Sequence, residues 1–203
     1  FSIDSPDGSF TIKSRDHLAD VAWTLHAVGR IPREPGAFPL QKVPLILPAR
    51  SPDFTGADHE RLTKAVGLDY GPAFRAIDTV WVEGGSAYAK LRVPEVVEPE
   101  LERIHLHPAL LDCTFQLIIQ LLKDDYIALA GTVYVPSSID GLLYRCGTAT
   151  PRMARATLHK CGRHSLTASF VLFDAGGELV AAIKEARFSS VRLRKSPAER
   201  LRY

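Results

Sequence analysis

A single carboxylate, Asp112, lies in the middle of an otherwise apolar stretch that runs from Leu110 to Leu122. Gln116 follows four residues later, which places both side chains on one face of a helix. An ionised carboxylate among apolar side chains is costly, so it either finds hydrogen-bond partners or holds a proton at neutral pH. Two interpretations therefore stay open from the residues alone. Asp112 is either a buried side chain that holds a loop in place or a general acid that Gln116 orients.

The histidines and the cysteine near Asp112 do not form a recognisable set of metal ligands. His105 and His107 are separated by one residue, but neither a cysteine of suitable spacing nor a third histidine is close in sequence. We therefore expect no metal, and we expect His107 to begin the helix and anchor the preceding loop. Cys113 points to another face of the helix than Asp112, so we expect it to pack in the core.

Residues 70–74 are expected to form a turn that carries two aromatic side chains. Gly71 and Pro72 favour a tight turn. Tyr70 and Phe74 either close an edge of the core or line a half-wet pocket. We favour the pocket, because the hydroxyl of Tyr70 suits a site with one wet side.

The elements that must position these residues follow from the pattern of apolar side chains. Pro108 suits the first helical position, and the run to Leu122 is apolar on nearly every side, which predicts a buried helix. Two strands before it and several after it are expected at 76–82, 87–93, 132–135, 141–146, 154–160, 165–174 and 178–192. The first pair and the last pair should form hairpins across 83–86 and 174–177. A long helix wrapped by a bent antiparallel sheet is the hotdog arrangement, so the sequence predicts an α+β hotdog fold.

The first third of the chain predicts less regular structure. A period near two from Asp20 to Ile31 predicts a strand with one buried face, and His26 lies on the opposite face. Residues 32–52 contain six prolines, which favours an extended linker over a ligand for a proline-binding domain, since apolar residues are interleaved. A short helix is expected from Asp58 to Val66, with His59 on its polar face.

Composition excludes several classes of function. The chain has 203 residues, 46% of them hydrophobic, which is enough for one domain or slightly more. Its net charge of +2 is too small to indicate nucleic-acid binding. We find no apolar run that could span a membrane and no secretion signal. Three cysteines without ligand spacing favour a reducing, cytoplasmic location.

Two motifs resemble those of one family. His107-Pro108-Ala109-Leu110-Leu111-Asp112-x-x-x-Gln116 resembles the second signature of dehydratase domains in modular type I polyketide synthases and related fatty acid synthases. The segment Tyr70-Gly71-Pro72-Ala73-Phe74 resembles the Tyr-Gly-Pro-x-Phe signature of the same family. The two occur in the family's order, which is far more specific than either alone. The resemblance covers residues 66–193 well and 23–31 more weakly.

The resemblance implies a double hotdog, of which this chain would hold the C-terminal part. The expected division is 1–34 as remnant strands of the first hotdog, 35–57 as a proline-rich linker, 58–193 as the C-terminal hotdog and 194–203 as an exit linker. The family's catalytic base lies in a histidine motif of the first hotdog, and no histidine of this chain has that spacing. His26 is therefore interpreted as a strand residue, and the chain alone is expected to be inactive.

The activity implied by the resemblance is elimination of water from a β-hydroxyacyl thioester. Asp112 would be the acid, Gln116 its orienter and Tyr70 a second hydrogen-bonding contact. The substrate would arrive on the phosphopantetheine arm of an acyl carrier protein, with no metal or redox cofactor. Its pocket would be lined by six residues: Gly71, Pro72, Phe74, His107, Val135 and Pro136.

Other implications and alternatives accompany this assignment. Residues 135–139 occupy the place of a family stretch with two aromatics but contain none. Expected partners are the carrier protein, other domains of the same synthase and a second copy in a homodimer, without nucleic acid or membrane. The alternatives are a double-bond isomerase or cyclase on the same scaffold, or a non-catalytic structural half.

Overall fold

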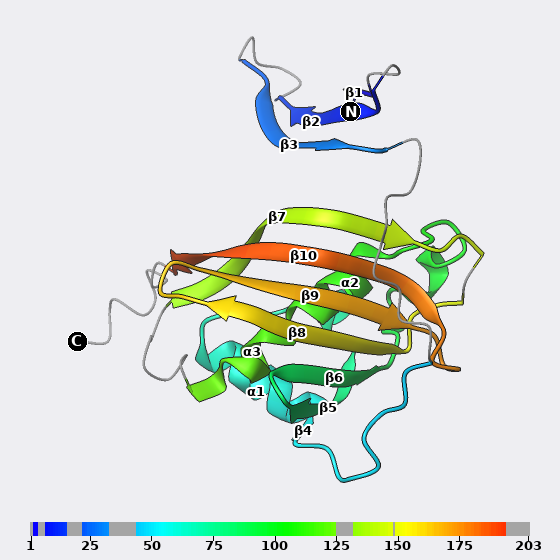
Figure 1. Cartoon of the computed structure of the whole chain (residues 1–203), viewed down its shortest axis with the longest axis vertical. Helices are drawn as coiled ribbons and strands as arrows, with labels where there is room; N and C mark the ends of the chain where they lie inside the picture. Colours follow the sequence, from blue (N-terminus) through cyan, green and yellow to red (C-terminus); the bar gives the residue numbers. More distant parts are fainter. Residues whose placement is uncertain are drawn as a thin grey trace. The chain divides into compact units, whose positions relative to one another are not determined.

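The computed structural model describes residues 2–3, 7–15, 22–32, 44–124, 132–147 and 149–193. The chain divides into two compact units, residues 1–39 and 40–203. The first unit is a three-stranded antiparallel sheet in the order β1-β2-β3 (Figure 1). Its strands are β1 (Ser2–Ile3), β2 (Ser9–Ser14) and β3 (Thr24–Arg30).

The strand predicted at 20–31 is present as β3, but its buried face is not. Trp23 and Leu25, on the face predicted to be buried, are 57% and 55% exposed, and Val28 on the opposite face is 67% exposed. The described residues of this unit form a single sheet without a second layer of their own, so neither face is covered from within the unit. His26 lies on the strand as expected, and its Nε2 is 2.5 Å from Ser14 Oγ.

The second unit is built on a seven-stranded antiparallel sheet in the order β4-β5-β6-β8-β9-β10-β7. Its strands are β4 (Phe54–Thr55), β5 (Ile77–Glu83), β6 (Ser86–Leu91), β7 (Thr132–Tyr144), β8 (Met153–Cys161), β9 (Ser165–Phe173) and β10 (Leu179–Arg192). The helices whose bounds fall within its described residues are α1 (Gly56–Ala65), α2 (Pro108–Phe115) and α3 (Ile118–Leu121), with two 3₁₀ turns, η1 (Pro72–Phe74) and η2 (Glu98–Glu100). The sheet curves past the helices (Figure 1). The predicted α+β hotdog fold is confirmed.

The core lies between the sheet and the α2–α3 segment. The ring of Phe115 on α2 meets Phe170 and Phe188 edge-on, with centroids 4.9 and 5.6 Å apart. Opposite the helices the sheet carries alanines that are completely buried, so the helices can approach the strands closely. These are Ala87, Ala89, Ala154, Ala156, Ala168 and Ala186.

Both predicted hairpins form. Gly84 and Gly85 have φ angles of 56° and 75° between β5 and β6. Two positive φ angles are what a two-residue type I′ turn requires, and glycine adopts them without a steric penalty. Strands β9 and β10 pair antiparallel across residues 174–177, where the backbone N–H of Asp174 donates to Glu178 O at 2.9 Å.

The prediction of two strands at 132–135 and 141–146 is wrong, because β7 is one strand of 13 residues. It pairs along its whole length with the 14-residue β10, which provides a continuous partner. Pro136 is tolerated since β7 is an edge strand and the register shifts at Arg187/Phe188, opposite this proline.

The prediction of one unbroken helix to Leu122 is also wrong. The helix is interrupted at Gln116 and Leu117, which separate α2 from α3. The backbone N–H of Leu117 bonds to Thr114 O at 3.3 Å, and that of Ile119 bonds to Gln116 O at 3.0 Å. These i to i−3 bonds tighten the turn locally into 3₁₀ geometry. Both pieces are nevertheless buried, as expected.

Helix α1 begins two residues before the predicted helix. Its N-cap, Thr55, forms a capping box with Asp58, and Gly67 follows the helix with φ 91°. The described part of the proline-rich segment, residues 44–52, forms neither helix nor strand, and Leu45 is buried with its N–H donating to Gly177 O at 2.9 Å. Residues 33–43 and the predicted exit linker 194–203 lie outside the described residues.

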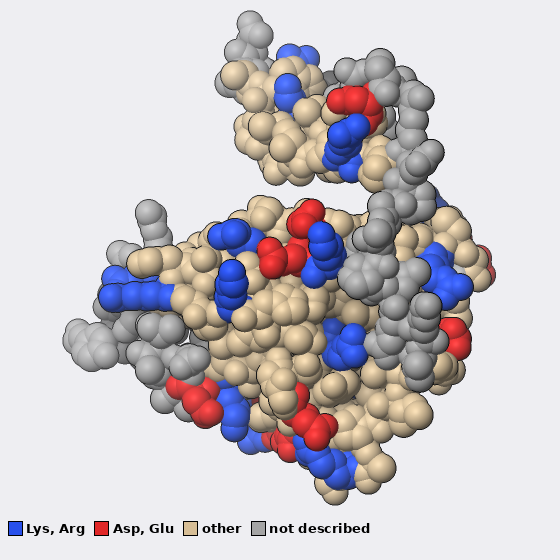
Figure 2. All heavy atoms as spheres, in the orientation of Figure 1, with Lys and Arg blue, Asp and Glu red and all other residues tan. Residues whose placement is uncertain are grey.

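Charges on the second unit are mixed in sign. Figure 2 shows lysines and arginines interspersed with acidic side chains on the face drawn. One ion pair joins β10 to the neighbouring edge strand β7, with Lys184 Nζ 3.7 Å from Asp140 Oδ2. Across the described ranges, every helix is too short or too polar to cross a membrane.

Candidate active site

Asp112 lies in the middle of α2 and is half-buried. Its Oδ2 accepts a hydrogen bond from Gln116 Nε2 at 3.0 Å, one helical turn further on. Within the described part of the chain, this neutral amide is its single hydrogen-bond partner and no cation pairs with it. The predicted pairing of the two side chains is therefore present in the structure.

Burial raises the pKa of the Asp112 carboxyl group above its usual value, and the hydrogen bond from Gln116 opposes this only in part. The cause is that apolar surroundings disfavour the charged form of the carboxyl group. A raised pKa increases the fraction of the neutral acid near neutral pH. This is the property that a proton donor needs.

Gln116 is buried and makes contacts beyond Asp112. Its Nε2 also donates to the backbone oxygen of Phe74 at 3.2 Å, and its Oε1 is 2.9 Å from His59 Nε2. The amide nitrogen of Gln120 in turn contacts His59 Nδ1. A continuous chain of hydrogen bonds therefore runs from the acid into the core.

The position of His59 corrects the sequence prediction. We expected it on the polar face of α1, but it is only 4% exposed and faces the α2–α3 segment. Burial lowers the pKa of His59, so the neutral ring is favoured. The sequence carried one unused signal, which is Gln120, a second glutamine one turn after Gln116 inside the same apolar run.

Cys113 is completely buried, and its thiol donates to the backbone oxygen of Phe74 at 3.3 Å. Burial raises the pKa of this thiol to about 12. A thiol that does not ionise is a poor nucleophile. The expectation that Cys113 packs in the core is confirmed.

The turn at 70–74 reaches the acid through its backbone. Phe74 O accepts from Gln116 and from Cys113, while the Phe74 ring, 38% exposed, lies 6.4 Å from the ring of Tyr70. Gly71 and Pro72 begin the 3₁₀ turn η1 and are exposed. The hydroxyl contact of Tyr70 with the acid stays a prediction.

His107 begins α2, as expected. Its Nδ1 accepts from the backbone N–H of Ala109 at 3.2 Å, and its Nε2 is 3.2 Å from Glu100. The ring of His105 stacks on Tyr144 with centroids 6.3 Å apart. No cluster of three metal-ligating side chains occurs among the residues that the structure describes.

Val135 and Pro136 lie on the edge strand β7, opposite Ser189 and Phe188. Val135 is 37% exposed, and Phe188 packs on Phe115 of the helix that carries the acid. The two residues thus lie on the strand next to β10, and β10 contacts α2 through Phe188. Their predicted contact with substrate stays a prediction.

A small hollow, open to solvent, lies between α1 and the 70–75 turn. Gln116, His59, Tyr70 and Phe74 line it, together with the charged side chains of Glu60, Lys64 and Arg75. Asp112 is not in its lining. The hollow therefore borders residues that contact Asp112 or Gln116. It is not the tunnel predicted at Phe74, Val135 and Pro136, because neither Val135 nor Pro136 lines it.

Comparison with known proteins identifies what the chain resembles. The family model described as polyketide synthase dehydratase N-terminal domain matches residues 45–198. The spectinabilin polyketide synthase system protein NorB of Streptomyces orinoci is 32% identical over 164 residues, which cover 79% of this chain. The highly reducing polyketide synthase dmxL2 of a Cryptosporiopsis species is 33% identical over 129 residues, or 59% of this chain.

A solved structure shows the same fold. The dehydratase domain from the CurJ module of curacin polyketide synthase superimposes with a TM-score of 0.72 at 25% identity, covering 91% of this chain and 64% of that domain. The matched regions are 7% of the length of NorB and 5% of that of dmxL2. The chain therefore spans a small part of the synthases and less than two thirds of a solved dehydratase domain.

Proposed function

The chain belongs to the polyketide synthase dehydratase family, and on that premise we propose that it is the acid-bearing part of an enzyme that eliminates water from a β-hydroxyacyl thioester. Membership implies hydro-lyase activity in the parent synthase. Asp112 is the proposed general acid. The observation that carries this assignment is a half-buried carboxyl group whose partner is a neutral amide and whose pKa is raised by burial.

In the proposed reaction a base removes the α-proton and the electrons of that C–H bond form the new C=C bond. The Cβ–O bond breaks, and the proton of Asp112 passes to the leaving oxygen, which departs as water. Hydroxide is a poor leaving group, so a neutral acid at this point lowers the barrier. Gln116 orients the carboxyl group, and Tyr70 is the proposed second hydrogen-bonding contact.

The base and the oxyanion donors are proposed to come from a companion hotdog, with residues 58–193 as the C-terminal of two such units. Substrate would be delivered by an acyl carrier protein on a phosphopantetheine arm, beside other domains of the same synthase and in a homodimer. The proposed pocket is lined by Phe74, Val135 and Pro136. Gly71 and Pro72 at the start of η1 and His107 at the start of α2 complete the proposed lining.

The test is Asp112→Asn in the dehydratase domain of the parent synthase. Asparagine keeps the shape and still accepts from Gln116, but it cannot supply a proton. We expect turnover to fall by about 10²- to 10⁴-fold, the usual contribution of a general acid. Loss of water from a β-hydroxyacyl carrier protein is followed by mass spectrometry. Near-normal turnover by a folded Asp112→Asn protein would refute the assignment.

Asp124→Asn is the matched control, because it makes the same chemical change at an exposed aspartate that follows α3. We expect it to leave turnover unchanged. The product distinguishes the alternatives on this scaffold. An enoyl thioester that has lost water supports a dehydratase, whereas a shifted double bond or a ring at unchanged mass supports an isomerase or a cyclase.

A second test uses the 203-residue chain alone. It carries the acid, but none of its seven histidines has the family's base motif. Absence of a single oxyanion donor already costs about a hundredfold or more. We therefore expect no dehydration above the no-enzyme control. A clear rate above that control would place the base within this chain, with His26 as the first residue to substitute.

A further inference from the structure

The amide of Gln116 is contacted at both ends, and one contact determines which end is which. Its Nε2 lies 3.2 Å from the backbone oxygen of Phe74 and 3.0 Å from Asp112 Oδ2. A peptide oxygen can only accept, so the end of the amide that faces Phe74 has to be the NH₂ group. The amide oxygen of Gln116 therefore faces His59.

The tautomer of His59 follows from that orientation. Gln116 Oε1, 2.9 Å from His59 Nε2, is an acceptor, so Nε2 carries the hydrogen and donates. Nδ1 then holds a lone pair and accepts from the amide nitrogen of Gln120. Gln120 keeps this orientation although its own Oε1 is buried without a partner among the described residues. Leaving that oxygen unpaired is costly, so the contact with His59 compensates for it in part.

This orientation decides where the proton of Asp112 resides. Gln116 donates to Oδ2, and a carbonyl oxygen accepts a hydrogen bond better than the hydroxyl oxygen of a neutral carboxyl group, so Oδ2 is favoured as the carbonyl oxygen. The protonated acid therefore carries its hydrogen on Oδ1, the oxygen that Gln116 does not contact. If the amide were reversed, the carboxyl group would donate its hydrogen to Gln116 Oε1, and the proton would be held by the protein.

We propose that His59, supported by Gln120, is a positioning residue that acts together with the backbone oxygen of Phe74 to keep the amide of Gln116 in the orientation that leaves the transferable proton of Asp112 on Oδ1. The inference rests on the proposed function of Asp112 as the acid. His59 reaches Gln116 across 57 residues of sequence and Gln120 across 61, so the arrangement exists only in the folded chain.

The charged groups around His59 come from three elements. Glu60 and Lys64 lie on its own helix, and Arg75, after η1, is 3.7 Å from Glu60. Asp112 faces it from α2 through Gln116. Burial nevertheless lowers the pKa of His59, which favours the neutral ring that the hydrogen-bond chain requires.

The test is His59→Phe in the parent dehydratase, measured as kcat and KM across pH. Phenylalanine keeps a ring but cannot donate to Gln116. We expect kcat to fall about tenfold, the effect of one buried hydrogen bond, with KM within about twofold. The alkaline limb of the pH profile should also move to higher pH, because donation from Gln116 lowers the pKa of Asp112 and this donation weakens.

Conservative and control variants keep the test decisive. In His59→Gln an amide NH₂ can donate to Gln116 and an amide oxygen can accept from Gln120. We therefore expect kcat close to the wild-type value and an alkaline limb at the wild-type pH. Thr63→Val alters another buried side chain, one turn along α1, and should leave both unchanged. A fall in kcat without a shift of the limb, or no fall at all, would overturn the proposal.

If His59→Phe does not fold, the same kinetic measurements are made on Gln120→Leu. It removes the donor to His59 and should lower kcat about threefold, with the limb shifted in the same direction. An unchanged profile would overturn the inference. Asp112→Asn distinguishes failure of the proposed function from failure of this inference. An active Asp112→Asn enzyme refutes the proposed function of Asp112. An inactive Asp112→Asn enzyme together with a wild-type-like Gln120→Leu enzyme refutes only the role of His59.

Discussion

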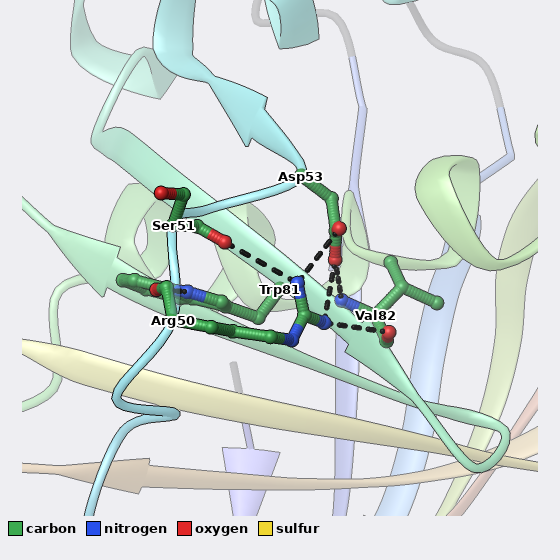
Figure 3. A network of polar contacts seen from close by, with 5 residues as sticks. All are labelled: Arg50, Ser51, Asp53, Trp81 and Val82. Atoms are coloured by element: carbon green, nitrogen blue, oxygen red, sulfur yellow. Dashed lines mark hydrogen bonds and ion pairs between the residues drawn. The ribbon is translucent and has the colours of Figure 1, made fainter.

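Asp53 and Asp112 are two carboxylates of one structural unit with opposite surroundings. Asp53 is exposed, and its two oxygens each lie 2.8 Å from a guanidinium nitrogen of Arg50 (Figure 3). Its Oδ2 also accepts the backbone N–H of Val82 at 2.8 Å. The hydrogen bond from Arg50 is the largest of the causes that lower the pKa of Asp53 to about 2.

Around Asp53 the contacts join one segment to one strand. Arg50 also donates to Val82 O at 3.1 Å, and its own backbone oxygen accepts from Trp81 Nε1 at 2.8 Å. All five residues of the network lie in two stretches, 50–53 and 81–82 (Figure 3). The charged aspartate thus attaches residues 50–53 to β5 within the second unit.

The hydrogen-bond partner of Asp112 is a neutral amide, whereas that of Asp53 is a guanidinium group. Asp112 is also half-buried, whereas Asp53 is exposed to solvent. Its pKa is raised for that reason. The difference shows that the residue type alone does not assign a role. A cation and exposure keep Asp53 ionised at neutral pH, whereas an amide and burial leave Asp112 able to hold a proton.

The largest expected effect comes from giving Asp112 the kind of partner that Asp53 has. Gln116→Lys places a cation beside the acid, which favours the carboxylate and lowers its pKa. We expect turnover at neutral pH to fall about a hundredfold, since the proton donor is lost. The alkaline limb of the pH profile should move to lower pH, opposite to the shift expected for His59→Phe.

Thermal unfolding of Gln116→Lys is the control, because the side chain is only 3% exposed. A folded Gln116→Lys enzyme with an unchanged limb would show that residue 116 does not set the protonation of Asp112.

A smaller effect is expected when the amide is removed without adding charge. Gln116→Ala loses the orienting hydrogen bond but leaves the acid itself, so we expect kcat to fall about tenfold, less than in Asp112→Asn. Single-turnover dehydration measures this step directly. A loss equal to that of Asp112→Asn would indicate that Gln116 has more than an orienting role.

The comparison also predicts stability changes of opposite sign. The folded-state pKa of Asp112 is raised, so its contribution to stability is full below the unfolded value of about 3.9 and is lost as pH rises through the folded pKa. Asparagine does not ionise. Asp112→Asn should therefore raise the free energy of unfolding at pH 7 by on the order of 1 kcal/mol. Urea unfolding of the chain at pH 4 and pH 7 measures the difference, which should shrink in acid.

Asp53→Asn should give the smallest effect, with the reverse sign. The folded pKa of Asp53 is lowered to about 2, so its contribution is present above about pH 4 and is lost as pH falls towards 2. The pair is exposed at 44% and 37%, and solvent screening limits the loss at neutral pH to less than about 1 kcal/mol. The same urea series measures it. A loss that persists at pH 2 would mean that the network does not act through charge.

Local patterns in the sequence determined much of the second unit. Pro108 at the helix start, the i, i+4 spacing of Asp112 and Gln116, and the two glycines between β5 and β6 all act within a few residues. Such features depend on backbone geometry, which is the same in any fold. That is why the hotdog fold and the pairing of Asp112 with Gln116 could be predicted.

Only the tertiary structure decided which distant side chains complete the site. His59 looked like a surface residue because α1 is polar overall, and its burial depends on the α2–α3 segment packing against it. The continuity of β7 depends on the length of β10, and Asp53 meets Arg50 and Val82 only where two stretches align. These contacts form between segments that are far apart in sequence, and local residue spacing does not predict which of those segments pack together.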